Sequence, residues 1–200
     1  MRVLIGCEFS GVARRAFARL GHDAWSCDLL PAEDRSNQHI VGDVRDHLAD
    51  GWDLLAVFHP PCTRLCNSGV RWLIERNLWT ELEEAAAFFS TLWNAPIPRR
   101  AIENPIMHHY AKARIVGYRE PAQIIQPWQF GHPETKATCL WLHGLMPLYP
   151  TNIVDGRTHR VHRLSPSPTR WRERSRTYEG IAEAMAQQWG GQCGGTRKAA

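Results

Sequence analysis

Short apolar runs that end at polar or turn-forming residues alternate with helical stripes along this sequence. Strands are predicted for the runs at 3–7, 24–27, 39–41, 54–58, 101–102, 122–126 and 137–142. Helices are predicted where apolar residues recur at helical spacing, over 11–20, about 70–93 and 178–189. Strands that alternate with helices build βαβ units, so the sequence predicts an α/β fold whose parallel sheet is covered on both faces.

Composition narrows the class of protein. With 200 residues, the chain makes one domain or at most two small ones. Hydrophobic residues make up 44% and charged residues 22%, which excludes wholesale disorder. The net charge of +4 fits an anionic partner without demanding one. Nine tryptophans offer large rigid apolar surfaces, both for a core and for stacking on flat ligands.

The cysteines and the start of the chain bear on its compartment. Six cysteines are irregularly spaced, and the N-terminus lacks the long apolar stretch and small-residue cleavage site of a secretory signal. No stretch approaches the 18 apolar residues that would span a membrane. The sequence therefore predicts reduced thiols in a cytoplasmic protein without a membrane partner.

Polar residues follow the predicted strands at the edge where open parallel sheets bind ligands. After the first strand, CEFSGVAR combines a turn at Gly11 with a helix start, which is typical of a nucleotide site. The full G-x-G-x-x-G fingerprint is missing, so an ordinary βα turn is the alternative. Asp28 ends the next strand, where an acid commonly accepts hydrogen bonds from ribose hydroxyls. Its alternative role is to cap a helix or to lie solvated in a loop.

The loop HPPCTRLCNSG at 59–69 carries a candidate nucleophile. Pro60 and Pro61 restrict the backbone just before Cys62. A thiol held beside Arg64 and His59 has the surroundings that lower a cysteine pKa and activate it for attack. A buried, inert thiol is the alternative.

A metal site is a further alternative for the same loop. His59, Cys62 and Cys66 could supply three ligands, with His108 or His109 as a fourth. The chain has no second cysteine pair, and it lacks the H-x-E and P-C-x-x-C motifs of zinc deaminases. The sequence therefore favours a site without metal.

Glu103 ends the predicted strand in RAIENP. A buried carboxyl there could protonate or hydrogen-bond a heterocycle, and a structural carboxylate is the alternative. Cys62 after a proline and Glu103 before an asparagine follow a strand–glycine–helix start in this order. The chain in this respect resembles the DNA cytosine-5 methyltransferase family. The resemblance implies a doubly wound, mostly parallel, Rossmann-like methyltransferase fold.

The resemblance also implies S-adenosylmethionine as the cofactor. EFSG resembles the family's first block, whose Phe-x-Gly turn cradles the cofactor, and the later glycines of that block are Ala13 and Arg14 here. YEGIAEAMA at 178–186 resembles the last block, whose helix lines the cofactor site. Together these matches predict the cofactor-binding residues Glu8, Phe9, Ser10, Gly11, Asp28, Asp43, Pro60 and Gly180.

The remaining blocks imply catalytic roles. Pro60–Cys62 resembles the nucleophile loop, and Glu103–Pro105 resembles the Glu-Asn-Val block. FGHPETKATCLWL resembles a later block with two arginines, which are Lys136 and Thr138 here. In the implied reaction, Cys62 adds to C6 of cytosine and Glu103 binds N3, after the base has left the DNA stack. The predicted catalytic residues are Cys62, Glu103, Lys136 and Thr138.

Between the last two blocks, the family carries a target-recognition domain. This chain has a basic segment at 150–176 in that place, which divides a catalytic domain (1–149) from a completing helix (177–190) and a flexible tail (191–200). Arginines interleaved with Trp171, His159 and His162 suit phosphate contacts and base stacking, and a solvated basic loop is the alternative. The predicted DNA-binding residues are Arg64, Arg157, Arg160, Arg163, Arg170 and Arg172.

So short a segment predicts little sequence specificity for a DNA substrate, which could be single-stranded. Two other functions stay open. One is C5 modification of a free pyrimidine nucleotide such as dCMP. The other is a catalytically inactive accessory protein that binds DNA, which the altered first block and Thr138 suggest.

Overall fold

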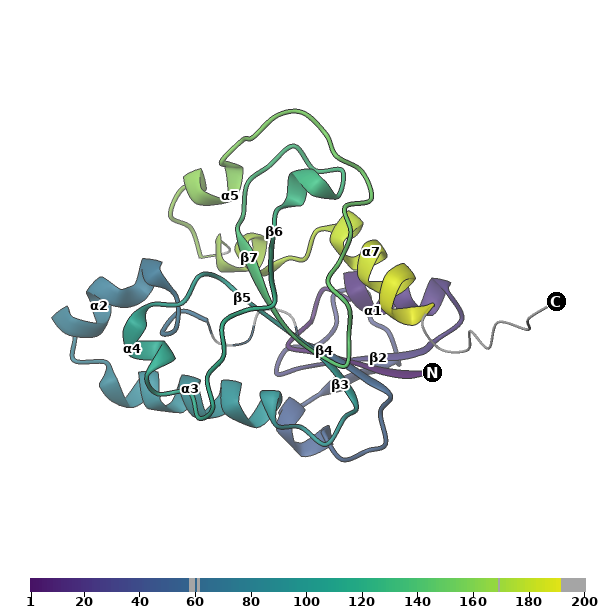
Figure 1. The fold of residues 1–200 in the computed structure, drawn as a ribbon, viewed down its shortest axis with the longest axis horizontal. Coiled ribbons are helices and arrows are strands. Elements are labelled where there is room, and N and C mark those ends of the chain that lie inside the picture. The colour runs from purple at the N-terminus through teal and green to yellow at the C-terminus, as the bar shows by residue number, and fades with distance from the viewer. Residues whose placement is uncertain (58–59, 61, 169, 192–200) are drawn as a thin grey trace.

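A computed structural model describes residues 1–57, 60, 62–168 and 170–191 (Figure 1). Its centre is a seven-stranded sheet in the order β3-β2-β1-β4-β5-β7-β6. The strands are β1 (Arg2–Gly6), β2 (Asp23–Asp28), β3 (His39–Val41), β4 (Leu54–Val57), β5 (Arg99–Asn104), β6 (Gln123–Ile125) and β7 (Thr138–His143). The predicted α/β class and the mostly parallel sheet are confirmed.

The first five strands are parallel, and the order reverses direction between β1 and β4, which pair from Val3 with Leu54 to Gly6 with Val57. β7 departs from this pattern. It runs antiparallel to both β5 and β6, so that Glu103 faces Leu140 across the ladder. The sheet is therefore not parallel at this edge. Antiparallel strands can be joined without a crossover helix, and no such helix is needed here.

The helices are α1 (Val12–Arg19), α2 (Val70–Glu75), α3 (Trp79–Trp93), α4 (His109–Lys112), α5 (Arg160–Arg163), α6 (Arg170–Ser175) and α7 (Glu179–Gly190). The described residues also form the short 3-10 helices η1 (Val44–His47), η2 (Asn67–Gly69) and η3 (Pro127–Gln129). The helix predicted over 70–93 is two helices. Asn77 has a positive φ of 52° between them, a left-handed conformation that stops α2 before α3 begins.

Apolar layers cover both faces of the sheet. Leu4 and Leu55 point to one face, where Phe89 of α3 packs on them. Val3 and Leu54 point to the other face, together with Phe17 of α1 and Trp189 of α7. Figure 1 shows α1 and α7 side by side on that second face. Successive residues of a strand point to opposite faces, and both faces are covered, so nearly every residue of these strands is apolar.

Two further findings concern the described residues. In this part of the chain, no helix has the length and apolar character needed to cross a membrane. The thiols of Cys7, Cys27, Cys62, Cys66 and Cys139 are all free.

Candidate active site

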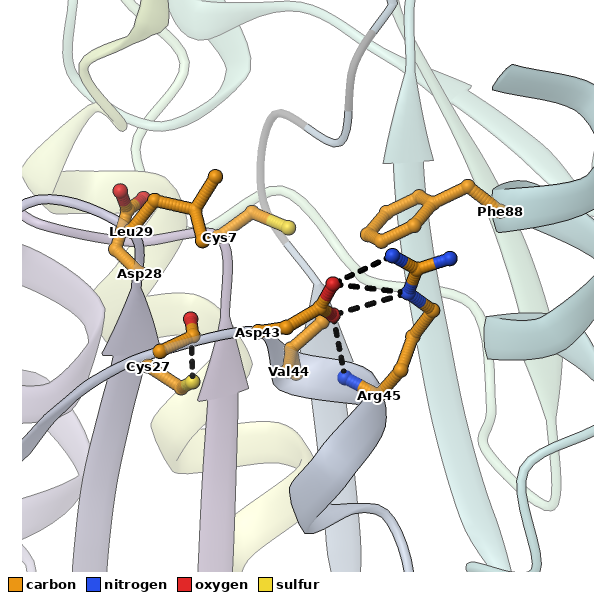
Figure 2. A pocket seen from close by; sticks show the side chains of 9 residues that line it. Cys7, Cys27, Asp28, Leu29, Asp43, Val44, Arg45 and Phe88 are labelled. Carbon is orange, nitrogen blue, oxygen red and sulfur yellow. Dashed lines mark hydrogen bonds and ion pairs between the residues drawn. The ribbon is translucent and has the colours of Figure 1, made fainter. Parts of the chain in front are cut away.

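A cavity of about 310 Å³ opens at the carboxyl ends of β1, β2 and β3 (Figure 2). It lies beside the reversal of strand order between β1 and β4, the usual ligand position in such sheets. Its size is at the lower end of the range for small-molecule sites. The lining residues are Cys7, Cys27, Asp28, Leu29, Gly42, Asp43, Val44, Arg45 and Phe88.

The two predicted acids both line this cavity, but their surroundings differ. Asp28 is half-buried and accepts a hydrogen bond from the Leu30 N–H at 2.9 Å, and burial raises its pKa. Asp43 accepts hydrogen bonds of 2.5 to 3.0 Å from the Arg45 side chain, which lowers its pKa. Figure 2 shows Phe88 across the cavity from Asp28. An acid facing an aromatic ring suits a ligand with a sugar hydroxyl and a flat base.

The first βα turn is built around Glu8. This carboxyl is 3% exposed and accepts hydrogen bonds from the backbone N–H of Ala13 at 2.7 Å and of Arg14 at 3.2 Å. It also accepts one from the Ser10 hydroxyl at 3.3 Å. Burial raises the pKa of Glu8, and the backbone hydrogen bonds oppose that rise. Glu8 therefore caps α1 with a carboxyl from its own chain, at the helix end that attracts anions.

Gly11 lies in the left-handed region at φ 69°, and a Cβ there would meet both Arg14 Nη2 and Asp34 Oδ2 at 2.8 Å. Arg14 is 4% exposed and pairs with Asp34. Its Nε is buried and has no hydrogen-bond partner within the described residues. A buried N–H donor without a partner at this turn could bind an anionic group, such as the carboxylate of S-adenosylmethionine. The cavity and this donor together fit the cofactor that the resemblance implies.

The basic segment packs over the same turn. The ring of Trp171 in α6 lies 5.7 Å from that of Phe9, and Arg176 forms an ion pair with Glu33 at 2.9 Å. Glu33 itself donates its backbone N–H to the Phe9 carbonyl at 2.9 Å. α6 is therefore attached to the region predicted to bind the cofactor.

Three of the predicted catalytic residues come together at the ends of β4 and β5. Lys136 Nζ lies 4.0 Å from Glu103 Oε1, and the charges of both residues act on the Cys62 thiol. Burial raises the pKa of Glu103, which is 6% exposed, and lowers the pKa of Lys136, while each opposes the other's shift. Both groups are thus pushed toward their neutral forms, as expected of a buried pair.

Cys62 and Cys66 lie four residues apart, at the two ends of one helical turn. The N–H groups of Leu65 and Cys66 both donate to the Cys62 carbonyl, at 2.9 and 3.0 Å. Interaction with Cys66 and burial raise the pKa of Cys62, and the pKa of Cys66 is lowered to about 5. The expectation that the surroundings of Cys62 lower its pKa was therefore wrong, because the thiol is buried beside Cys66 and the Glu103 carboxyl. The Ser68 hydroxyl lies 3.1 Å from the Cys66 sulfur. The chain therefore places a second thiol against the predicted nucleophile.

His108 fixes this loop from the other side. It is buried, its Nε2 donates to the Arg64 carbonyl at 2.7 Å, and its Nδ1 accepts the Ala111 N–H at 3.0 Å. Both ring nitrogens are thus engaged within the protein. Within the ranges that the structure describes, no group of three His, Cys, Asp or Glu side chains could hold a metal ion. His59 and Pro61 lie outside those ranges.

The structure places the other predicted residues as follows. Pro60 is buried. Thr138 is buried at the start of β7, and its hydroxyl donates to the Lys136 carbonyl at 3.1 Å. Gly180 lies in α7, where a Cβ would meet the Phe130 carbonyl oxygen at 1.9 Å, so close helix docking explains this glycine.

The arginines of the basic segment have unlike surroundings. Arg157 stacks 3.9 Å from the centre of the Trp128 ring, and Arg160 pairs with Glu134 at 2.8 Å. Arg170 is half-buried, whereas Arg163 and Arg172 are exposed. In the loop before η2, Arg64 lines a second cavity together with Arg45 and Phe88, which also line the first. The predicted DNA contacts are therefore spread over two regions.

The sequence gives no functional role to Cys7, and it offers Cys66 and His108 only as candidate metal ligands. Cys7 lines the cavity and turns the chain out of β1 with a positive φ of 56°, a strained conformation for this residue type. The closeness of Cys66 to Cys62 follows from their C-x-x-x-C spacing on one helical turn. His108 has no sequence signal for its bond to a carbonyl far away along the chain.

No family model and no curated protein matches the sequence. Solved structures do match. A protein described as a prophage-encoded DNA modification methyltransferase of E. coli has a TM-score of 0.50 and 14% identity, over 83% of this chain and 55% of the other. The Entamoeba histolytica methyltransferase EhMeth has a TM-score of 0.52 and 12% identity, over 84% and 60%. The S. pombe Dnmt2 methyltransferase has a TM-score of 0.45 and 16% identity, over 74% and 51%.

The chain thus spans little more than half the length of the solved structures it matches. Sequence identities this low establish a shared fold, and activity has to be argued from the residues of the site. The α/β fold of this protein, with its mostly parallel seven-stranded sheet, matches the fold of these methyltransferase structures.

Proposed function

We propose that this protein transfers a methyl group from S-adenosylmethionine to C5 of cytosine in DNA. The observation that carries the proposal is the convergence of Cys62, Glu103 and Lys136 at adjoining strand ends. The cavity lined by Asp28 and Asp43 opens on the same edge of the sheet. The two neighbours with TM-scores of 0.50 and 0.52 are described as methyltransferases, one of them as modifying DNA, which supports the assignment.

Each residue of the cluster has a distinct task in this reaction. The Cys62 thiolate adds to C6 of cytosine, which makes the C5 carbon electron-rich. Glu103 holds its proton because it is buried, and it donates that proton to N3 as charge develops on the ring. Lys136 then lies beside the carboxylate that remains. When bound, S-adenosylmethionine supplies the electrophilic methyl group. A base then takes the C5 proton, and the electron pair of that C–H bond re-forms the C5=C6 bond as the Cys62–C6 bond breaks.

Cofactor binding is assigned to the cavity and the first βα turn. Asp28 accepts hydrogen bonds from the ribose hydroxyls, and Phe88 offers an apolar wall to the adenine. Arg14 Nε provides the buried donor for the carboxylate end. Glu8 acts indirectly, because it holds the backbone of the turn by capping α1.

The DNA is held by the basic segment and by the loop that carries Cys62. Arg163 and Arg172 are exposed and suit phosphate contacts, and the half-exposed Trp171 ring suits base stacking. The segment packs on its own catalytic domain through Arg160 and Trp171. We therefore expect little sequence specificity.

A free pyrimidine nucleotide is the second candidate substrate. It is favoured by the engagement of Arg157 and Arg160 within the protein, because the pairing of Arg160 with Glu134 reduces the charge available to a long phosphate backbone. Salt separates the two substrates, since DNA binding weakens steeply with salt through counterion release. A nucleotide enzyme would turn over dCMP with no DNA present.

Incubation with radiolabelled S-adenosylmethionine and either cytosine-containing DNA or dCMP tests the proposal. We expect label at cytosine C5 of DNA with the wild-type protein and none with Cys62→Ser. Transfer to dCMP alone would replace the main proposal by the second candidate. Transfer to neither substrate, or equal transfer by Cys62→Ser, would refute both.

A further inference from the structure

We infer that α2 forms a second DNA-binding surface, which holds a single-stranded stretch of DNA beside the loop that carries Cys62. The residues of this surface are Arg71, Trp72 and Arg76, and we call them the α2 surface. The class of partner, DNA, rests on the proposed function. The assignment of these three residues to that partner rests on their exposure, charge and contacts.

The α2 surface brings an exposed aromatic ring and two cations together. Trp72 is 37% exposed, and the guanidinium carbons of Arg71 and Arg76 each lie 4.3 Å from the centre of its ring. Both arginines are exposed. Glu75 pairs with Arg71 at 3.2 Å, but this exposed pair balances only one of the two cations. The surface therefore keeps a net positive charge, which complements a phosphate backbone.

Core packing does not account for the α2 surface. Leu73 is the residue that attaches α2 to the core, and it is buried. Trp72 belongs to neither apolar core of the described residues. Its ring can stack on a base, and such stacking is stronger than the cation–π contact of an exposed arginine. A base that stacks on Trp72 therefore displaces a guanidinium group, which is then free to contact a phosphate.

The backbone fixes the α2 surface to the nucleophile loop. Gly69 directly precedes α2, and a Cβ on it would lie 2.0 Å from the carbonyl oxygen of Thr63, the residue after Cys62. Leu65 of the loop and Leu73 of α2 are buried in the same core. The loop and the helix are therefore packed together. We place the nucleotides next to the reacting cytosine on α2 for this reason.

The basic segment contacts the DNA from a different side. Figure 1 shows α2 at the left of the molecule and α5 of the basic segment at the top, apart from each other. Within the basic segment, Arg157 stacks on a tryptophan ring and Arg160 pairs with a glutamate. The α2 surface thus adds positive charge at a second point along the strand. Stacking needs an unpaired base, so this surface fits single-stranded DNA.

Fluorescence anisotropy with a short labelled single-stranded DNA tests the inference without cofactor and without catalysis. Binding is measured at several salt concentrations for the wild type, Trp72→Ala, Trp72→Phe and the double variant Arg71→Ala/Arg76→Ala. Thermal denaturation shows whether each variant folds, and all of them keep Leu73 as the buried anchor of α2.

The matched control is the double variant Arg2→Ala/Arg19→Ala. Both arginines are exposed and paired with an acid, and Arg2 also stacks on a tryptophan ring, at 4.5 Å. Arg2 begins β1 and Arg19 ends α1, so both lie at the amino edge of the sheet, opposite the Cys62 loop. The control therefore removes the same charge from the other side of the molecule.

We expect Trp72→Ala to weaken binding at least about fivefold and Trp72→Phe to restore most of the affinity. The Arg71→Ala/Arg76→Ala variant should reduce the slope of log K against log salt by about 1.4, and the control should keep the wild-type slope. Wild-type binding by Trp72→Ala and by Arg71→Ala/Arg76→Ala would overturn the inference, as would an equal loss in the control. A wild-type protein that binds no DNA would overturn the inference and the proposed DNA substrate together. Weaker binding by the α2 variants, without methyl transfer by the wild type, would leave the α2 surface standing and reject the proposed function instead.

Discussion

Replacing His108 tests whether a buried imidazole holds the nucleophile loop. In His108→Ala, the Arg64 carbonyl loses its donor at 2.7 Å. The Ala111 N–H loses the imidazole acceptor at 3.0 Å but keeps the backbone carbonyl of residue 108 at 3.1 Å. Each of the two hydrogen bonds contributes about 1 kcal/mol, and the Arg64 carbonyl left unsatisfied adds about 1 kcal/mol more. We therefore expect the free energy of unfolding to fall by about 3 kcal/mol. For a chain of this size, that lowers Tm by roughly 6–12 °C.

Thermal and urea denaturation of His108→Ala measure this loss, and Cys62 alkylation shows whether the loop has moved. His108→Asn separates the two contributions, because asparagine can still cap α4 but cannot reach Arg64 in the same way. His109→Ala is the control, since His109 is the exposed neighbour. A loss below about 1 kcal/mol in His108→Ala, equal to that of His109→Ala, would refute the reasoning.

Three further outcomes are expected. Burial raises the pKa of Glu103 in the folded protein. The contribution of Glu103 to the free energy of unfolding is therefore full below its unfolded pKa of about 4.3 and is lost as pH rises through the folded pKa. Urea titrations from pH 4 to 8 should show a shallower decline of this free energy with pH in Glu103→Gln than in the wild type, and an unchanged slope would contradict this. Gly180→Ala should cost about 1–3 kcal/mol in urea unfolding, because its Cβ meets a carbonyl oxygen at 1.9 Å, whereas exposed Gln187→Ala on the same helix should cost little. For single-stranded DNA, replacing both Arg163 and Arg172 with alanine should reduce the slope of log K against log salt by about 1.4; a wild-type slope would exclude both as phosphate contacts.

The sheet could be predicted from the sequence because its strands are buried on both faces. Continuous apolar runs such as 3–7 and 54–58 stand out wherever turns or acids end them. The direction of β7 could not be predicted in this way. Whether Glu103 faces Leu140 in a parallel or an antiparallel ladder depends on pairing, and side-chain alternation is the same in both. The break at Asn77 was also missed, because apolar residues on either side of it keep near-helical spacing.

The strand-end rule accounts for the part of the site that could be predicted. It brings Asp28 and Asp43 to the cavity and Cys62 to Glu103. All four lie at or just beyond the carboxyl ends of parallel strands of one sheet. The rule does not tell whether an acid at a strand end contacts a ligand or caps the next helix. Glu8 caps α1, which only the three-dimensional structure shows. The His108 bond to Arg64 joins residues 44 positions apart, so no local pattern encodes it.

The covalent bond between Cys62 and the cytosine ring is the central claim, and 5-fluorocytosine tests it most directly. Fluorine at C5 cannot leave as a cation, so the enzyme should remain joined to the DNA once the methyl group has been transferred. With S-adenosylmethionine and single-stranded DNA containing 5-fluorocytosine, we predict an adduct that survives denaturation. Peptide mass spectrometry should place it on Cys62, and Cys62→Ser should form none. An adduct on another residue, or methylated cytosine from a Cys62→Ser protein, would contradict the account.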